Sequence, residues 1–119
     1  MYKIKKRMEI CAAHKLDLPY ESKCKNLHGH GYIVTVYCES ETVNEQGMVV
    51  DFALMKQRIH GLMDHGYLND IFDFNPTAEN MARWICDEVT KMCETPTGRC
   101  YRVDVQESEG NIATYEVHP

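Results

Sequence analysis

The sequence has 119 residues, the length of one ordinary domain, and we expect a single domain over residues 1–119. Hydrophobic residue types make up 44% of the chain and charged types 26%. That balance is typical of globular proteins and excludes a mostly disordered chain. The net charge of −5 provides no strong basic field for a nucleic-acid backbone, so we expect no nucleic-acid partner.

The chain shows no targeting or membrane signal. No apolar run approaches the roughly 18 residues that cross a bilayer, so we expect no membrane partner. The lysine-rich start, residues 1–7, has no apolar segment behind it, which predicts no signal peptide and a cytoplasmic location. The six cysteines form no CxxC pair, and in a cytoplasmic protein we expect reduced thiols.

Two strands are predicted first, over residues 1–14 and 31–38, where β-branched and aromatic residues are frequent. A polar connection, residues 15–26, lies between them. A helix follows over residues 51–63, because Asp51 is a favourable N-cap and apolar residues recur at helical spacing. Residues 66–75 are expected to form a loop. Thr77 then caps a second helix that runs to about Cys93.

Two more strands are predicted at the end of the chain, over residues 101–107 and 112–117, with a hairpin turn between them. The order is therefore ββααββ, which indicates an α+β fold with an antiparallel sheet. Two helices cover only one face of such a sheet and leave the strand edges unpaired. Because exposed edges need a partner or a cover, we expect a homo-oligomer.

A candidate metal site begins with the motif His28-Gly29-His30. On a strand, residues i and i+2 point to the same face, so the two imidazoles stand side by side. His14 ends the first predicted strand and is the natural third ligand. Catalytic zinc takes three protein ligands and keeps one position open, so these three histidines favour a catalytic zinc site. The alternative is two exposed strand histidines with no metal.

Cys24 lies four residues before His28, between Lys23 and Lys25. Neighbouring positive charge lowers the pKa of a thiol, so this cysteine can act as a nucleophile or a base. It can also serve as a zinc ligand, or be an ordinary free thiol in a loop. The spacing leaves these three interpretations open.

Asp64 and His65 stand at the predicted end of the first helix. A carboxylate beside an imidazole can orient and charge it, as in a proton relay. The pattern by itself favours a plain polar helix end, because a histidine near a helix C-terminus is favourable in any case. His60, on the polar side of the same helix, is given no role.

Glu107 continues the strand face assigned to Tyr101, Val103 and Val105, which is otherwise apolar. A carboxylate in that place is either at the solvent end of the strand or holds a ligand. Its two oxygens suit an amidine-like edge, such as that of guanine or pterin.

Several segments appear in order along nearly the whole chain: residues 11–14, 24–32, 47–52, 64–65 and 76–80, and Glu107. Together they resemble the 6-pyruvoyl-tetrahydropterin synthase family. The resemblance implies the tunnelling fold, in which trimers close a twelve-stranded barrel and two trimers stack into a hexamer. It also implies that the sites lie between subunits.

The resemblance further implies a role for each candidate side chain. Zinc would be the cofactor, Cys24 would be the catalytic base with Asp64 and His65 as its proton-relay partners, and Glu107 would anchor a pterin ring with help from Thr77. The metal ligands that carry over are His14, His28 and His30.

The short gap between Cys24 and His28 resembles the bacterial branch of the family, the 6-carboxytetrahydropterin synthases. Membership implies a carbon–carbon lyase that converts 7,8-dihydroneopterin triphosphate to 6-carboxy-5,6,7,8-tetrahydropterin, acetaldehyde and triphosphate, on the route to queuosine and tRNA modification. Two alternatives remain. One is the pyruvoyl-forming branch. The other is a non-catalytic, zinc-stabilised binding module in which Cys24 is a fourth ligand.

Overall fold

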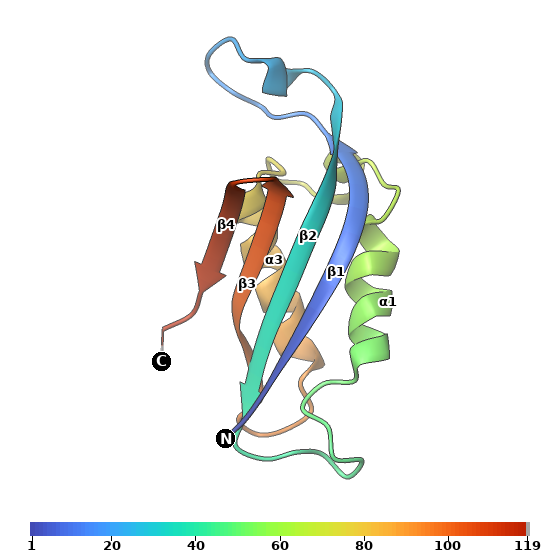
Figure 1. Cartoon of the computed structure of the whole chain (residues 1–119), viewed down its shortest axis with the longest axis vertical. Helices are drawn as coiled ribbons and strands as arrows, with labels where there is room; N and C mark the ends of the chain where they lie inside the picture. Colours follow the sequence, from blue (N-terminus) through green and yellow to red (C-terminus); the bar gives the residue numbers. More distant parts are fainter. Residues whose placement is uncertain (119) are drawn as a thin grey trace.

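Four antiparallel strands form one sheet in the order β1-β2-β3-β4, with the helices packed on one side of it (Figure 1). The computed structural model describes residues 1–118. The elements are β1 (Tyr2–His14), η1 (Lys23–Lys25), β2 (His28–Ser40), α1 (Phe52–Met63), α2 (Leu68–Ile71), α3 (Ala78–Met92), β3 (Arg99–Ser108) and β4 (Asn111–Glu116). The ββααββ order predicted from the sequence is confirmed, and α2 and η1 are additions to it.

Both long helices begin at the residues that the sequence indicated. The Asp51 carboxylate accepts the backbone N–H of Ala53 at 2.8 Å, and the Thr77 hydroxyl accepts the N–H of Asn80 at 3.1 Å. These bonds satisfy donors that the first helical turn leaves free. No helix within residues 1–118 is long and apolar enough to cross a membrane.

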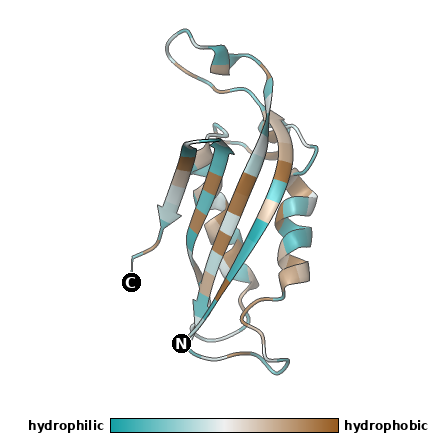
Figure 2. Cartoon of the chain, viewed as in Figure 1, coloured by the Kyte–Doolittle hydropathy of each residue, from teal (hydrophilic) through white to brown (hydrophobic). Residues whose placement is uncertain are grey.

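The core lies between the sheet and the helices. Alternate residues of the strands are buried, and Figure 2 shows the resulting apolar bands along them. Val34 and Val103 on the sheet lie in one buried cluster with Ile59 of α1 and Ile85 of α3. Full burial of one such side chain contributes about 1.5–3 kcal/mol, so this layer fixes which strand face points inward.

Two local expectations were wrong. Residues 66–75 contain the short helix α2 rather than only a loop, because Leu68 is fully buried there. Tyr101 does not share a face with Val103. The β2–β3 register shifts between Tyr37 and Cys38, and the bulge turns the Tyr101 ring toward Tyr37 and Lys3 on the uncovered face. Cys100 takes the buried position instead.

The strands β1 and β4 are the two edges of the sheet. The segment at residues 65–66 covers the end of the β1 edge near residues 11–13. The Ala13 N–H donates to Gly66 O, and the His65 N–H donates to Cys11 O. Residues 2–10 of β1 and the outer edge of β4 carry no further strand within residues 1–118. β1 and β4 are therefore the two outer strands of the sheet that carries the site described next.

Candidate metal and catalytic site

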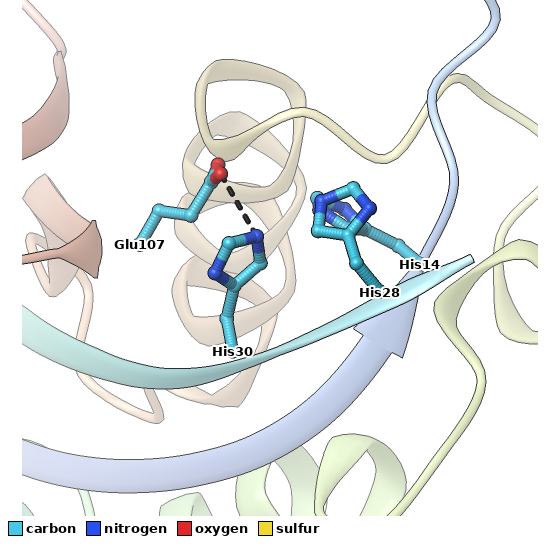
Figure 3. Close-up of side chains that lie close together, drawn as sticks. All are labelled: His14, His28, His30 and Glu107. Atoms are coloured by element: carbon cyan, nitrogen blue, oxygen red, sulfur yellow. Dashed lines mark hydrogen bonds and ion pairs between the residues drawn. The ribbon is translucent and has the colours of Figure 1, made fainter. Parts of the chain in front are cut away.

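The paired ends of β1 and β2 bring three imidazoles together (Figure 3). His14 is the register partner of His28, and His30 follows two residues later on the same face. The ring centroids of His14 and His28 are 4.5 Å apart, and those of His28 and His30 are 4.7 Å apart. Antiparallel pairing therefore turns three positions of the sequence into one compact group of nitrogen ligands.

Two backbone carbonyls fix the proton position on two of these rings. His14 Nδ1 lies 2.8 Å from Pro76 O, and His28 Nδ1 lies 2.7 Å from Asn26 O. A carbonyl oxygen only accepts, so each Nδ1 carries the proton and each neutral ring presents a lone pair on Nε2. The two Nε2 atoms face each other at 3.0 Å. A cation between them satisfies both lone pairs, and such carbonyl partners are typical of metal-ligating histidines.

His30 and Glu107 complete the cluster. His30 Nε2 is buried and makes no hydrogen bond with good geometry, although a Glu107 carboxylate oxygen lies 3.0 Å away. One ligand atom from each of His14, His28, His30 and Glu107 lies within 4.8 Å of the other three. An orphaned ring nitrogen beside two converging lone pairs fits a divalent metal that binds imidazole, such as zinc.

Burial of His14 and His30 favours the neutral form of these two rings, which is the form that binds a metal. Desolvation lowers the pKa of His14 and of His30 below the ordinary value of 6.5, although the Glu107 carboxylate acts in the opposite direction. The Tyr32 hydroxyl lies 3.2 Å from His14 Nδ1 and 3.3 Å from its Nε2. Tyr32 has no role among the expectations from the sequence, although its position two residues after His30, on the same strand face, is a usable signal.

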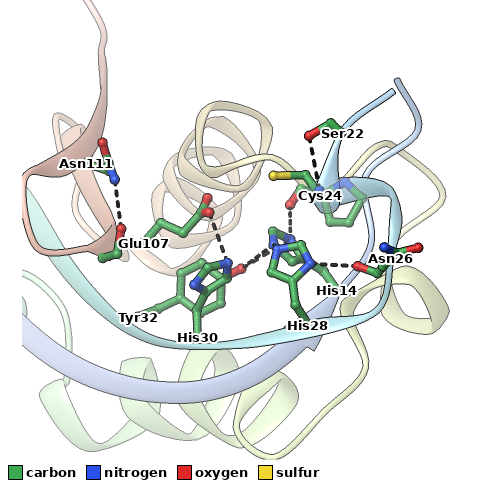
Figure 4. Close-up of polar contacts among 11 residues, drawn as sticks. His14, Ser22, Cys24, Asn26, His28, His30, Tyr32, Glu107 and Asn111 are labelled. Carbon is green, nitrogen blue, oxygen red and sulfur yellow. Dashed lines mark hydrogen bonds and ion pairs between the residues drawn. The ribbon is translucent and has the colours of Figure 1, made fainter. Parts of the chain in front are cut away.

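Cys24 lies on η1, in the segment that leads into β2. The Ser22 hydroxyl accepts the Cys24 N–H at 3.1 Å, and the Leu16 N–H donates to Cys24 O at 2.7 Å. In the view of Figure 4, Cys24 lies at the end of the site next to His14 and His28, and Glu107 lies at the other end. The thiol is partly exposed, so it remains reachable from solvent.

Asp64 and His65 are held against the edge of β1. Asp64 Oδ1 accepts the Cys11 N–H at 2.9 Å, which lowers the pKa of this carboxyl, and His65 adopts a left-handed backbone with φ of 59°. Asp64 Oδ2 lies 3.3 Å from His65 Nε2 and 3.6 Å from His60 Nε2. The Asp64–His65 contact exists because α1 ends at Met63. The second neighbour, His60, is one to which sequence analysis gave no role.

The structure does not join this pair to Cys24 within one chain. No hydrogen bond or ion pair found in residues 1–118 links Cys24 to Asp64 or His65. His65 instead borders a hollow of about 410 Å³ with Gly29 and Gly31. Because Gly29 and Gly31 alternate with His28 and His30, that hollow opens on the opposite face of the strand.

Glu107 borders a second hollow, of about 400 Å³, together with Ala78, Glu79, Asn111 and Thr114. The expected position of Glu107 on the covered face is confirmed by its contact with His30. Thr77 lies directly before this group, and its hydroxyl caps α3. The Glu107 carboxylate therefore lies beside the candidate metal site and also borders a hollow along the edge strand β4.

Comparison with known proteins places these features in a family. Residues 3–118 match the family model for 6-pyruvoyl tetrahydropterin synthase. The chain is similar to 6-carboxy-5,6,7,8-tetrahydropterin synthases of Bacillus subtilis, at 31% identity over 96% of this chain and 84% of that protein, and of Synechocystis, at 36% over 97% and 93%. The structure resembles that of Caenorhabditis elegans 6-pyruvoyl tetrahydropterin synthase, with a TM-score of 0.75, 27% identity, and coverage of 98% and 96% of the two chains.

Proposed function

Because this chain belongs to the 6-pyruvoyl tetrahydropterin synthase family and has its tunnelling fold, we propose that it is a zinc-dependent carbon–carbon lyase. Its reaction converts 7,8-dihydroneopterin triphosphate to 6-carboxy-5,6,7,8-tetrahydropterin, acetaldehyde and triphosphate. We place this reaction in the cytoplasm, on the route to queuosine. The choice of branch is supported by the 6-carboxytetrahydropterin synthases among its relatives.

The observation that carries the proposal is the convergence of three imidazoles with an acidic neighbour. His14, His28 and His30 would hold the metal through ring nitrogen atoms. Backbone carbonyls already set the tautomers of the His14 and His28 rings. When bound, zinc supplies a Lewis acid that polarises the hydroxyl oxygens of the substrate side chain. Three histidines leave one position for substrate, as catalytic sites require.

Cys24 is proposed to move protons at the side-chain carbons of the substrate. It is partly exposed and lies on η1, four residues before His28. Positioned general bases typically contribute about 10²–10⁴-fold to a rate. Its removal should therefore affect turnover far more than metal binding.

Glu107 is proposed to recognise the pterin. One oxygen faces His30, and the side chain also lines the hollow along β4. A carboxylate that accepts two parallel N–H bonds matches the amino group and ring N–H of a pterin. Thr77, at the start of α3 beside that hollow, is proposed to assist.

Two copies of the chain are proposed to complete each site. The hollow beside Glu107 lies along β4, whereas Asp64 and His65 lie against β1, at the opposite edge of the sheet. If the β1 edge of one copy lies beside the β4 edge of another, the relay pair of one chain approaches the hollow of its neighbour. This closure also covers both unpaired edges, and its repetition gives a barrel. We propose a hexamer built from two such trimers.

One experiment tests the reaction directly. Zinc-loaded protein is mixed with 7,8-dihydroneopterin triphosphate, and the products are identified by mass. Acetaldehyde together with the 6-carboxy product supports the proposal. A 6-pyruvoyl product would move the chain to the branch of the C. elegans enzyme, and no conversion by protein that retains zinc would favour a non-catalytic binding module.

A further inference from the structure

The connection between β1 and β2 begins and ends at two of the candidate metal ligands. It leaves the sheet after His14, carries Cys24 on η1, and returns to the sheet at His28. Figure 1 shows that it projects beyond the end of the sheet. The position of the thiol relative to the histidines therefore depends on what holds this Cys24 segment, residues 15–27, in place.

Apolar packing contributes little to holding the Cys24 segment. Within residues 1–118, none of its side chains belongs to the buried core, and Tyr20 and Leu27 are 62% and 64% exposed. An internal hydrogen bond joins its two arms, since the Leu16 N–H donates to Cys24 O at 2.7 Å. Ordering such a connection costs conformational entropy, so polar contacts to the rest of the chain have to offset that cost.

Two asparagine side chains make those polar contacts. The Lys15 N–H donates to Asn69 Oδ1 at 2.9 Å, and Asn69 Nδ2 donates to Lys15 O at 2.9 Å. In the same way, the Asp17 N–H donates to Asn75 Oδ1 at 2.9 Å, and Asn75 Nδ2 donates to Asp17 O at 3.1 Å. Each carboxamide thus pairs with both backbone groups of one residue, as a residue of a neighbouring strand does.

The two residues held in this way flank Leu16, whose N–H donates to Cys24 O. In the part of the chain that the structure describes, no further hydrogen bond or ion pair joins the Cys24 segment to the rest of the chain, apart from the one made by the adjacent His28 ring. The four carboxamide bonds are therefore the polar contacts that fix where the Cys24 segment lies.

Asn75 also connects this contact to the histidine cluster. It directly precedes Pro76, whose carbonyl oxygen lies 2.8 Å from His14 Nδ1. The Asn75 carbonyl accepts the N–H of Thr77 at 2.8 Å and an Nδ2 hydrogen of Asn80 at 2.9 Å, which fixes this turn at the start of α3. One short turn therefore orients the ring of a metal ligand and holds the segment that carries the thiol.

We propose that Asn69 and Asn75 are positioning residues for Cys24, whose carboxamides hold the Cys24 segment so that the thiol faces a substrate bound at the histidines. This inference rests on the proposed role of Cys24 in catalysis. Displacement of a reacting group by about 1 Å can lower a rate by about 100-fold. Because backbone groups engage both carboxamides, their loss should act on turnover through Cys24 and leave zinc in place.

Hydrogen–deuterium exchange of the zinc-loaded, full-length protein tests the positioning without any turnover. Pepsin cleaves after leucine and aromatic residues, and cleavage after Tyr20 and Leu27 gives a peptide of residues 21–27. None of its amides bonds to Asn69 or Asn75. In a double variant that combines Asn69→Ala with Asn75→Ala, this peptide should exchange at least about tenfold faster, because the whole Cys24 segment opens more often.

Asn44→Ala is the matched control. The Asn44 carboxamide accepts the N–H groups of Gln46 and Met48, each at 3.0 Å, in the loop that follows β2. This variant loses the same kind of bond far from Cys24, and it should keep the wild-type exchange of the peptide and the wild-type turnover.

Steady-state kinetics with 7,8-dihydroneopterin triphosphate separate positioning from a merely structural role. The double variant should lower kcat by at least about tenfold, with KM changed by less than about threefold and zinc content retained. A merely structural loss would lower the zinc content or the folded fraction and leave kcat per zinc-loaded site unchanged. If the double variant does not fold, Asn69→Asp and Asn75→Asp replace it, because each keeps the oxygen that accepts a backbone N–H and loses only the donor.

The proposal is overturned if the peptide exchanges at the wild-type rate in the double variant, if kcat is unchanged, or if Asn44→Ala produces the same effects. Wild-type protein that does not convert the substrate contradicts the proposed function instead. The exchange result then still decides whether the two asparagines hold the Cys24 segment.

Discussion

The Nε2 atoms of His14 and His28 lie 3.0 Å apart, and each ring gives its Nδ1 proton to a different backbone carbonyl. The two lone pairs consequently point at one another across a space that a small cation can fill. The carbonyls belong to Pro76 and Asn26, which are far apart in the sequence. The fold therefore prepares the ligand nitrogens before any metal arrives, and this preparation leads to the first prediction.

Replacement of His28 by alanine should abolish stable zinc binding. The variant keeps only two of the three converging imidazole nitrogens, beside the Glu107 carboxylate. Because loss of a mere supporting partner typically costs 10–100-fold in affinity, loss of a ligand should cost more than about 100-fold. Metal content after dialysis checks this, and His118→Ala, a change at an exposed histidine at the chain end, should retain the wild-type content.

The Cys24→Ala variant should keep its zinc and lose turnover by about 10²–10⁴-fold, as expected for removal of a general base. Metal analysis and a product assay on the same preparation separate the two effects. A parallel loss of zinc would instead identify Cys24 as a fourth ligand, which is the arrangement of a closed structural site.

The Glu107→Gln variant should weaken substrate binding while zinc is retained. Hydrogen bonds to charged groups contribute about 1.5–3 kcal/mol, which corresponds to roughly a 10- to 150-fold rise in the dissociation constant of a pterin ligand. Calorimetry with a pterin lacking the triphosphate isolates this contact. If zinc content falls instead, the carboxylate near His30 is a metal ligand.

The Asp64→Asn variant should be less stable than wild type at neutral pH but not in acid. The Cys11 N–H lowers the pKa of Asp64 in the folded chain. A lowered pKa gives stability that is present above the unfolded value of about 3.9 and is lost as pH falls through the folded value. Melting temperatures of metal-free wild type and Asp64→Asn should therefore differ at pH 7, and the difference should shrink as the pH falls below the unfolded value. A difference that persists unchanged in acid would contradict the charge-based explanation.

Mixed oligomers test whether each site uses two chains. Cys24→Ala and Asp64→Asn should each be inactive alone. Coexpression of the two variants should restore activity, because a site that takes Cys24 from one chain and Asp64 from the other contains both. Random mixing makes such sites roughly a quarter of the total. Light scattering should also give three or six times the chain mass of 13.8 kDa. No recovery in a mixed assembly would place both residues in one chain's site.

Much of the fold could be predicted because local signals agreed with the packing. Asp51 and Thr77 are good N-caps, and both helices begin directly after them. The strand of His28 and His30 carried its two-residue alternation through Tyr32 and Val34. The Tyr101 face was predicted wrongly because a bulge adds one residue to the count, and alternation in one strand contains no sign of where its partner shifts.

The spacing of His28 and His30 was enough to predict that these two imidazoles stand side by side, because residues i and i+2 of a strand share a face. Only the tertiary structure decided that His14 lies opposite His28, that Pro76 and Asn26 set the tautomers, and that Glu107 reaches His30. It also placed Asp64 against the outer edge of β1, where its carboxylate accepts the Cys11 N–H. These relationships join residues up to 77 positions apart in the sequence. They depend on strand register and on where a helix ends, which a local pattern does not encode.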